Sequence, residues 1–263
     1  PFPGSGDGSR APRWPSRRGA ANACRVVVST PTALPVPAYD SASSRFSGGR
    51  SVCYGLGVSG LLITLEGVEG AGKTSQMMRL ERWLRRQGRK VERTREPDGT
   101  RLGLAVRRLF GRPGVKPAPL VDVFLFMAAR QQHVAEKIRP WLSRGRVILC
   151  DRYADATVAY QGYGRGVDPD LIRELNVRAT SGVLPDLTLL FDLDPADGFR
   201  RIRGRRFDHF EREALAFHRR VRRGYLEIHR AEPKRVRLVH AGREPDEVEA
   251  EVRAIVEDFF RGA

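Results

Sequence analysis

The chain has 263 residues, 41% of them hydrophobic, which is enough for one sizeable α/β domain and leaves an additional segment to explain. Its formal net charge of +16 suits polyanionic partners, but small phosphorylated molecules satisfy such a surface as well as nucleic acid does. No stretch approaches the roughly 20 apolar residues that a membrane-spanning helix needs, and three cysteines without metal or disulfide spacing indicate a reducing, cytoplasmic compartment.

Residues 1–58 form a distinct N-terminal extension, rich in Pro, Gly, Ser, Ala and Arg, with only Asp7 and Asp40 as acids. Such a segment buries too little apolar surface to fold, so we predict that it is disordered. Its composition fits an organelle transit segment. However, the first methionine is Met77, and a start there would remove the motif described next. Either the N-terminus is incomplete, or translation starts at a non-Met codon, for which Val58 is well placed. We therefore interpret these residues as untranslated upstream reading frame rather than as a targeting segment.

The first strongly patterned segment is a glycine-rich motif that follows the apolar run of residues 61–65. It reads Gly67, Val68, Glu69, Gly70, Ala71, Gly72, Lys73 and Thr74, the G-x-x-x-x-G-K-[ST] form of a phosphate-binding loop. Its glycines allow backbone N–H groups to turn inward around a polyphosphate at a helix N-terminus. We expect these eight residues to bind a nucleotide such as ATP, with Lys73 on the β and γ phosphates and Thr74 on Mg²⁺. The alternative, a strand-to-helix turn without a ligand, requires a chance match at four fixed positions.

Beyond this loop, apolar runs rich in β-branched residues alternate with amphipathic stretches. The runs predict strands at about 61–66, 90–94, 146–151, 187–193 and 236–240, with helices between them. The last helix, about 245–261, places Val248, Val252 and Val256 on one face. We therefore predict a phosphate-loop NTPase fold of the α/β class over residues 59–263, with a five-stranded parallel sheet and helices on both faces. Such sheets bind ligands at the carboxyl ends of their strands.

Further polar and aromatic residues gather at these predicted strand ends or on the helices just after them. In chain order they are Arg95 after the second strand; Phe126 and Arg130, four residues apart on a helix; Asp151 and Arg152 after the third strand; and Thr157, Tyr160 and Gln161 at helical spacing beyond it.

Together with the phosphate loop, this ordered set resembles thymidylate kinase, from about residue 61 to the C-terminus. The resemblance implies transfer of the γ-phosphoryl group of Mg-ATP to dTMP, giving dTDP and ADP for dTTP biosynthesis, without a covalent intermediate. It implies Mg²⁺ as the cofactor and ATP and dTMP as partners, and neither nucleic acid nor a membrane. A homodimer is expected on the resemblance alone.

Such a reaction brings two anionic phosphates together, so cations are needed on both. Arg95 and Arg152, at neighbouring strand ends, can fork onto the acceptor phosphate. Asp151 would orient Mg²⁺ together with Thr74. The structural alternative is that Asp151 and Arg152 serve as a helix N-cap and a surface ion pair. A carboxylate next to bound phosphates is repelled by them, so Glu69 requires a specific role. By resemblance, it reaches the 3′-hydroxyl of the acceptor.

The resemblance also assigns a binding site for the base and sugar. Phe126 stacks on thymine and Arg130 donates to its O4 oxygen; Thr157 faces the base edge, Tyr160 crowds the sugar 2′ position, and Gln161 belongs to the same group. Each has a structural alternative: an aromatic in the apolar run around Phe126 is often core, Tyr160 can be packing, and Thr157 and Arg130 can be surface residues.

The phosphate loop itself contains no arginine, and bacterial thymidylate kinases of this kind supply arginines from a flexible lid. An arginine-rich run begins at residue 200, where the resemblance places a lid of about residues 200–211. The candidate lid cations, which would act as an arginine finger supplied in cis, are Arg203, Arg205 and Arg206; a solvated helix face is the alternative. Departures from the family pattern are Asp98, Ala156 and His209, where glycine, serine and arginine are usual.

Two rival functions stay open at this point. A deoxynucleoside kinase or another nucleoside monophosphate kinase is the nearest, but the pair of Arg95 and Arg152 indicates an acceptor that already carries phosphate. A nucleic-acid-stimulated ATPase, or a non-catalytic nucleotide-binding module, would use the basic surface and would not need Arg130.

Overall fold

The computed structural model describes residues 60–202 and 214–262. The predicted extension of residues 1–58 and most of the predicted lid, about 200–211, lie outside the described residues. The three candidate lid arginines, Arg203, Arg205 and Arg206, lie outside them as well. Within the described part of the chain, no helix combines the length and the apolar character needed to cross a membrane.

Five parallel strands form the centre of the fold, which confirms the predicted sheet. They are β1 (Leu61–Gly67), β2 (Val91–Arg95), β3 (Val147–Asp151), β4 (Leu187–Asp192) and β5 (Val236–His240). Their order is β2-β3-β1-β4-β5, so β1 lies in the middle. Strands β1, β3 and β4 are buried almost throughout, because helices cover both faces of a parallel sheet; this explains their continuous apolar sequences.

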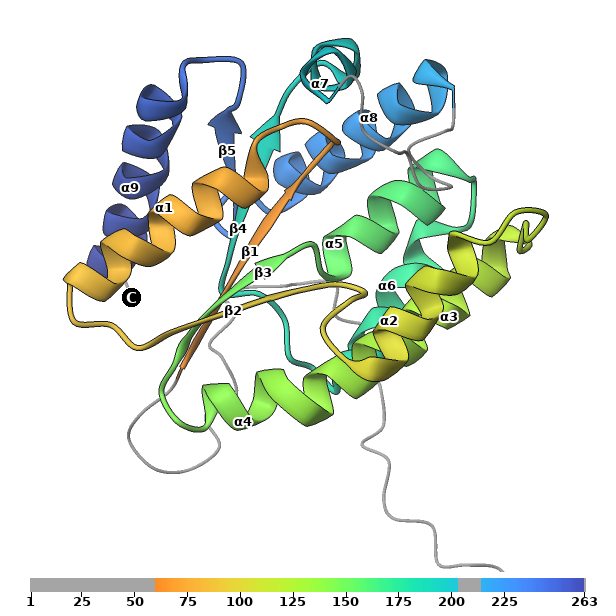
Figure 1. Ribbon diagram of the computed structural model, residues 1–263, viewed down its shortest axis with the longest axis horizontal. Coiled ribbons are helices and arrows are strands. Elements are labelled where there is room, and N and C mark those ends of the chain that lie inside the picture. The colour runs from red at the N-terminus through yellow and green to blue at the C-terminus, as the bar shows by residue number, and fades with distance from the viewer. Residues whose placement is uncertain (1–59, 203–213, 263) are drawn as a thin grey trace, which may run out of the picture. The chain divides into compact units, whose positions relative to one another are not determined.

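Helices α1 (Lys73–Arg86) and α9 (Pro245–Gly262) lie side by side on one face of the sheet (Figure 1). Because side chains alternate along a strand, Ile63 and Leu65 of β1 point to this face. The helical side chains that pack with them are Met77, Leu80, Leu84, Val248, Val252 and Val256. The predicted C-terminal helix is thus confirmed, and Pro245 is its first residue, where a missing N–H breaks no helical bond.

The other side of the sheet carries the remaining long helices (Figure 1). These are α2 (Arg101–Phe110), α3 (Pro119–His133), α6 (Pro169–Thr180) and α8 (Leu215–Ala231). Shorter segments are η1 (Val134–Ile138), α4 (Arg139–Leu142), α5 (Ala154–Thr157), η2 (Val158–Gly164) and α7 (Pro195–Arg201). Leu62, Ile148 and Leu190 supply strand side chains to the core on this side.

The segment after β3 differs from the simple helix predicted for Thr157, Tyr160 and Gln161. Thr157 ends α5, whereas Tyr160 and Gln161 lie in η2, a wider π-helical turn. One of its hydrogen bonds runs five residues back, from the N–H of Arg165 to the carbonyl of Tyr160, at 3.0 Å. A π turn is a rare, single-turn insertion in an α-helix, and helical spacing over so few residues does not reveal it.

Candidate active site

The carboxyl ends of three adjacent strands bring the predicted groups to one edge of the sheet. β1 runs into the phosphate loop, and β3 ends at Asp151, whose register partners are Leu65 on β1 and Arg95 on β2. The chemistry-bearing residues therefore gather where ligands of parallel α/β sheets bind.

The phosphate loop has the backbone conformation that its glycines predict. Gly67, Gly70 and Gly72 have φ angles of 135°, 73° and 83°, a region that side-chain-bearing residues rarely adopt. Gly70 also lies against α7: a Cβ atom on Gly70 would stand only 2.1 Å from the carbonyl oxygen of Gly198. Any larger residue at Gly70 would therefore distort the loop.

Lys73, the first residue of α1, points back into this loop. Its ammonium donates to the carbonyl oxygens of Gly67 and Val68, at 2.9 and 2.8 Å. Burial, followed by repulsion from Arg152, lowers the pKa of Lys73 to about 8. A bound polyphosphate would offset both effects, because its negative charge favours the protonated amine.

Glu69 is the single acidic residue of the phosphate loop and is contacted by several side chains. Its Oε1 atom accepts hydrogen bonds from Arg152 (Nη2, 2.8 Å) and from the hydroxyl of Tyr160 (2.5 Å). The ring atom Nδ1 of His218, on α8, lies 3.3 Å from Oε2. Burial acts to raise the pKa of Glu69, but Arg152 and its other neighbours outweigh burial and hold it below its usual range. Glu69 is therefore a fixed carboxylate anion.

Arg152 and Arg95 differ in how they sit at this edge. Arg152 reaches into the loop, where Nη1 donates to the carbonyl of Gly67 at 3.1 Å. Arg95 has a side chain that is 51% exposed and lies 3.5 Å from the carboxylate of Asp98. Among the described residues, no recorded contact joins the two guanidinium groups, so their joint action on one phosphate stays a prediction.

Thr74 and Asp151 meet beside the loop. The Thr74 hydroxyl donates to Oδ2 of Asp151 at 3.3 Å. Hydroxyl and carboxylate oxygens are the ligands that Mg²⁺ prefers, and Mg²⁺ usually takes its other ligands from water and substrate phosphates. In residues 60–202 and 214–262, no cluster of three or more His, Cys, Asp or Glu side chains is placed to hold a metal by itself. The pair fits a magnesium ion that arrives with a nucleotide.

Arg130 is the central member of a buried polar network. The residue is only 2% exposed. Its Nε and Nη2 atoms lie 2.9 and 2.8 Å from Oε2 of Glu96. It also donates to the Asn176 side-chain oxygen at 2.5 Å, the Tyr153 carbonyl at 2.9 Å and the Thr157 hydroxyl at 3.0 Å. All three nitrogens thus donate to protein atoms, so donation to a base carbonyl stays a prediction that requires one of these bonds to be shared or exchanged.

The other residues predicted to contact the base and sugar fall into two groups. Phe126 is half-buried and stacks on Phe110 of α2, with ring centroids 5.1 Å apart. Thr157, Tyr160 and Gln161, on α5 and η2, are all buried. The side-chain nitrogen of Gln161 has no hydrogen-bond partner among the described residues. A buried amide without a partner is costly, and a ligand acceptor would satisfy it.

Only the first residues of the predicted lid are described. Arg200 pairs with Asp197 within α7, and Arg201 donates to the carbonyl of Ala241 at 2.9 Å. These two arginines are thus engaged with protein groups. The assignment of Arg203, Arg205 and Arg206 as lid cations stays a prediction.

Sequence reasoning missed three residues that complete the site. Glu66 precedes the phosphate loop, and His218 and Tyr225 lie on α8. All three are buried, and each contacts Glu69, Arg152 or a neighbour of theirs. Of the three, only Glu66 gives a signal in the sequence, as the one charged residue of strand β1. Nothing in the sequence links α8 to β1.

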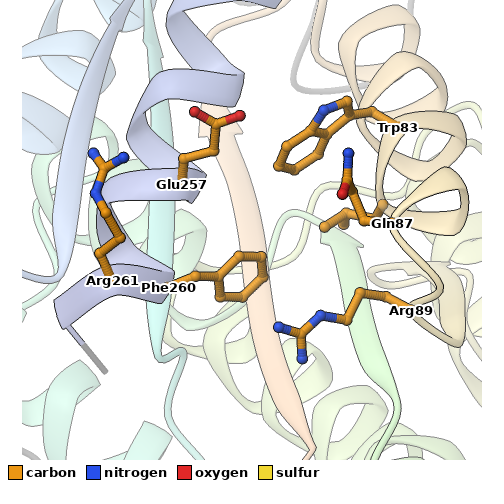
Figure 2. A pocket seen from close by; sticks show the side chains of 7 residues that line it. Trp83, Gln87, Arg89, Glu257, Phe260 and Arg261 are labelled. Carbon is orange, nitrogen blue, oxygen red and sulfur yellow. The ribbon is translucent and has the colours of Figure 1, made fainter.

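A pocket of about 310 Å³ lies elsewhere, between the C-terminal parts of α1 and α9 (Figure 2). The side chains of Trp83 and Phe260 extend into this space, and the guanidinium of Arg89 lies 4.8 Å from the Phe260 ring. A 14-residue helix is about 20 Å long, and Lys73 stands at the far end of α1. The pocket is therefore remote from the phosphate loop and includes none of the predicted substrate-binding residues.

Comparisons with known proteins agree with this geometry. The family model described as "Thymidylate kinase" matches residues 65–252. A thymidylate kinase of Deinococcus radiodurans is 50% identical over 200 residues, which cover 76% of this chain and 97% of that protein. One of Solidesulfovibrio magneticus is 48% identical over 207 residues, covering 74% and 98%.

A solved structure gives the same result. The crystal structure of thymidylate kinase from Ehrlichia chaffeensis matches with a TM-score of 0.61 and 33% identity, over 75% of this chain and 99% of that one. Fold, phosphate loop and sequence identity thus point the same way. This chain belongs to the thymidylate kinase family.

Proposed function

We propose that this protein transfers the γ-phosphoryl group of ATP to dTMP, giving dTDP and ADP. Family membership supports this reaction. The observation that carries it is the contact of Arg152 with both Gly67 and Glu69. This contact supports the reaction because a guanidinium beside the phosphate loop is suited to bind an acceptor phosphate next to the donor phosphates.

On the donor side, the loop N–H groups and the Lys73 ammonium hold the polyphosphate. Lys73 gives up its bonds to loop carbonyls in exchange for phosphate oxygens. Thr74 and Asp151 would hold Mg²⁺, which when bound neutralises charge on the phosphates and orients them. Catalysis is then a matter of positioning and of charge neutralisation.

On the acceptor side, Arg152 and Arg95 bind the monophosphate, and Glu69 accepts a hydrogen bond from the 3′-hydroxyl. Glu69 is suited to this task because its neighbours keep it ionised and fixed. Arg95 must turn from Asp98 toward the phosphate, which its exposure permits.

The base and sugar lie against residues of α3, α5 and η2. Phe126 stacks on thymine, and Gln161, with its unpartnered amide, and Thr157 face the base edge. Tyr160 crowds the sugar 2′ position and so favours deoxyribose. Arg130 holds Thr157 in place through a hydrogen bond. It donates to the base only if one of its N–H groups is shared between a protein acceptor and the base. The lid arginines Arg203, Arg205 and Arg206 stabilise the transferring group.

The acceptor preference tests this proposal. With Mg-ATP as donor, we expect turnover of dTMP to exceed that of dUMP, UMP, dCMP and thymidine in steady-state assays. Thymidine lacks the phosphate that Arg152 would bind, so it should be the poorest acceptor. If thymidine is phosphorylated as efficiently as dTMP, the protein is not a monophosphate kinase.

We further propose a homodimer, on the basis of an apolar surface. Helices α2, α3 and α6 lie together (Figure 1) and expose large apolar side chains. These are Leu102, Leu104, Leu120, Val121, Phe124, Leu171 and Val177. Neighbouring exposed apolar residues on adjacent helices are typical of an interaction surface.

Light scattering after size exclusion should therefore give twice the mass of the chain. Replacing both Val121 and Phe124 by glutamate should give the monomer mass, because charge at the centre of an apolar interface costs several kcal/mol. Met78→Glu, on α1, serves as the control because Met78 is also an exposed large apolar residue, and this variant should stay dimeric. A monomeric parent protein would refute the dimer without affecting the proposed reaction.

A further inference from the structure

Glu66 is a fully buried carboxylate that the proposed reaction does not use. It is the penultimate residue of β1, just before the phosphate loop. Its Oε1 atom accepts a hydrogen bond from the backbone N–H of Tyr153, at 2.7 Å. Its Oε2 atom accepts one from the hydroxyl of Tyr225, also at 2.7 Å. Both carboxylate oxygens are thus satisfied inside the protein.

The two hydrogen bonds of Glu66 converge on Arg152. Tyr153 follows Arg152 in the chain, and Arg152 has a φ angle of 67°, in the left-handed region that residues other than glycine rarely adopt. The bond to the Tyr153 N–H fixes the backbone immediately after this turn. The Tyr225 hydroxyl in turn accepts from Nη1 of Arg152 at 3.2 Å, so it also restrains the guanidinium.

The donors and acceptors of this chain are mutually consistent. Arg152 donates to the oxygen of Tyr225, and Tyr225 donates its own hydrogen to Glu66. A chain with a single direction of donation strengthens each of its bonds in a low-dielectric interior. Nη1 of Arg152 also donates to Gly67, and Nη2 donates to Glu69, so both terminal nitrogens of the guanidinium are held.

We infer that Glu66 and Tyr225 are positioning residues, which hold Arg152 in the orientation that binds the acceptor phosphate. This inference rests on the proposed function, since it needs Arg152 to contact that phosphate. A guanidinium held in place before the substrate arrives binds it without first losing conformational freedom. Tyr225 lies on α8, the helix that follows the predicted lid, so α8 helps to shape the acceptor site.

Tyr225→Phe is the test, because it removes one oxygen and leaves the ring in the core. We expect the KM for dTMP to rise roughly tenfold, as for loss of a hydrogen bond to a charged group. The KM for ATP should stay within about twofold, since the donor phosphates bind the loop. Tyr163→Phe is the matched control: Tyr163 packs on Gly224 of α8, and among described residues no hydrogen bond joins its hydroxyl to Arg152 or Glu66. It should leave both KM values unchanged.

A double-mutant cycle separates positioning from a merely structural role. If Tyr225 acts through Arg152, adding Tyr225→Phe to Arg152→Lys should change the KM for dTMP less than twofold. Equal effects of Tyr225→Phe in both backgrounds, or a lower melting temperature with a normal KM, would overturn the inference. Glu66→Gln, which keeps an acceptor for the Tyr153 N–H, should behave like Tyr225→Phe and replaces it if that variant does not fold.

The same cycle distinguishes failure of the inference from failure of the proposed function. An unchanged KM for dTMP in Arg152→Lys alone would show that Arg152 does not bind the acceptor, and the assignment on which the inference rests would fall. A raised KM in Arg152→Lys together with a normal KM in Tyr225→Phe would overturn only the positioning role.

Discussion

Arg130→Ala should lower the free energy of unfolding by about 3–5 kcal/mol, the cost of removing one partner of a buried ion pair. The guanidinium neutralises Glu96, which is itself buried. Without it, His133 is the one side chain among the described residues that still contacts the Glu96 carboxylate, with its Nδ1 atom 3.1 Å away. The side-chain oxygen of Asn176 and the carbonyl of Tyr153 would also lose a donor. Urea unfolding at equilibrium, with the slope checked for two-state behaviour, measures the change.

Arg178→Ala is the matched control for this experiment. Arg178 lies on α6 and pairs with Glu174 one turn away, at the surface. An exposed pair of this kind contributes at most about 0.5 kcal/mol. Combining Arg130→Met with Glu96→Gln should recover part of the lost stability, because no unpaired charge then stays buried.

The opposite outcome is equally informative about Arg130. The sequence interpretation, in which Arg130 donates to thymine, predicts a loss of about 2–4 kcal/mol in transition-state stabilisation with dTMP and a normally folded protein. If Arg130→Ala unfolds at the same urea concentration as the parent and loses only efficiency with dTMP, the buried network is dispensable and the residue acts on the substrate.

Glu66→Gln should make the protein more stable relative to the parent as the pH rises. Burial, with repulsion from Asp155 as a second cause, raises the pKa of Glu66 to about 7, from 4.5. A raised pKa in the folded state means that ionisation of Glu66 destabilises the fold. The penalty is absent below the unfolded pKa, near pH 4.5, and is complete above the folded pKa, near pH 7.

The difference in unfolding free energy between Glu66→Gln and the parent should therefore shift by about 2 kcal/mol in favour of the variant between pH 5.5 and pH 8. Denaturant titrations at several pH values measure this shift. Glu249→Gln is the control. Desolvation acts to raise the pKa of Glu249, but Arg79 and Arg253 outweigh it and lower this pKa. The difference in unfolding free energy between Glu249→Gln and the parent should therefore be constant over this pH range. A constant difference for Glu66→Gln as well would show that Glu66 does not titrate near neutral pH.

The sequence by itself determined the fold class and the backbone conformation of the phosphate loop. Five apolar runs and the glycine-rich motif after residue 65 are local signals, and the structure has a strand at each run. The phosphate loop could be predicted because its function depends on backbone conformations that its own glycines permit. The helix of residues 245–262 could be predicted because its apolar residues recur at helical spacing.

Only the tertiary structure decided which polar side chains face one another. The helical spacing of Phe126 and Arg130 is visible in the sequence, but the partners of Arg130 come from the residue just after β2, from α5 and from α6. Glu66 and Tyr225 are separated by 159 positions. Local sequence patterns indicate the hydrophobic period of each element and the residues that form its turns. The contacts of a buried charge depend instead on how elements distant in the sequence pack together. The spacing of residues along the chain carries no information about that packing.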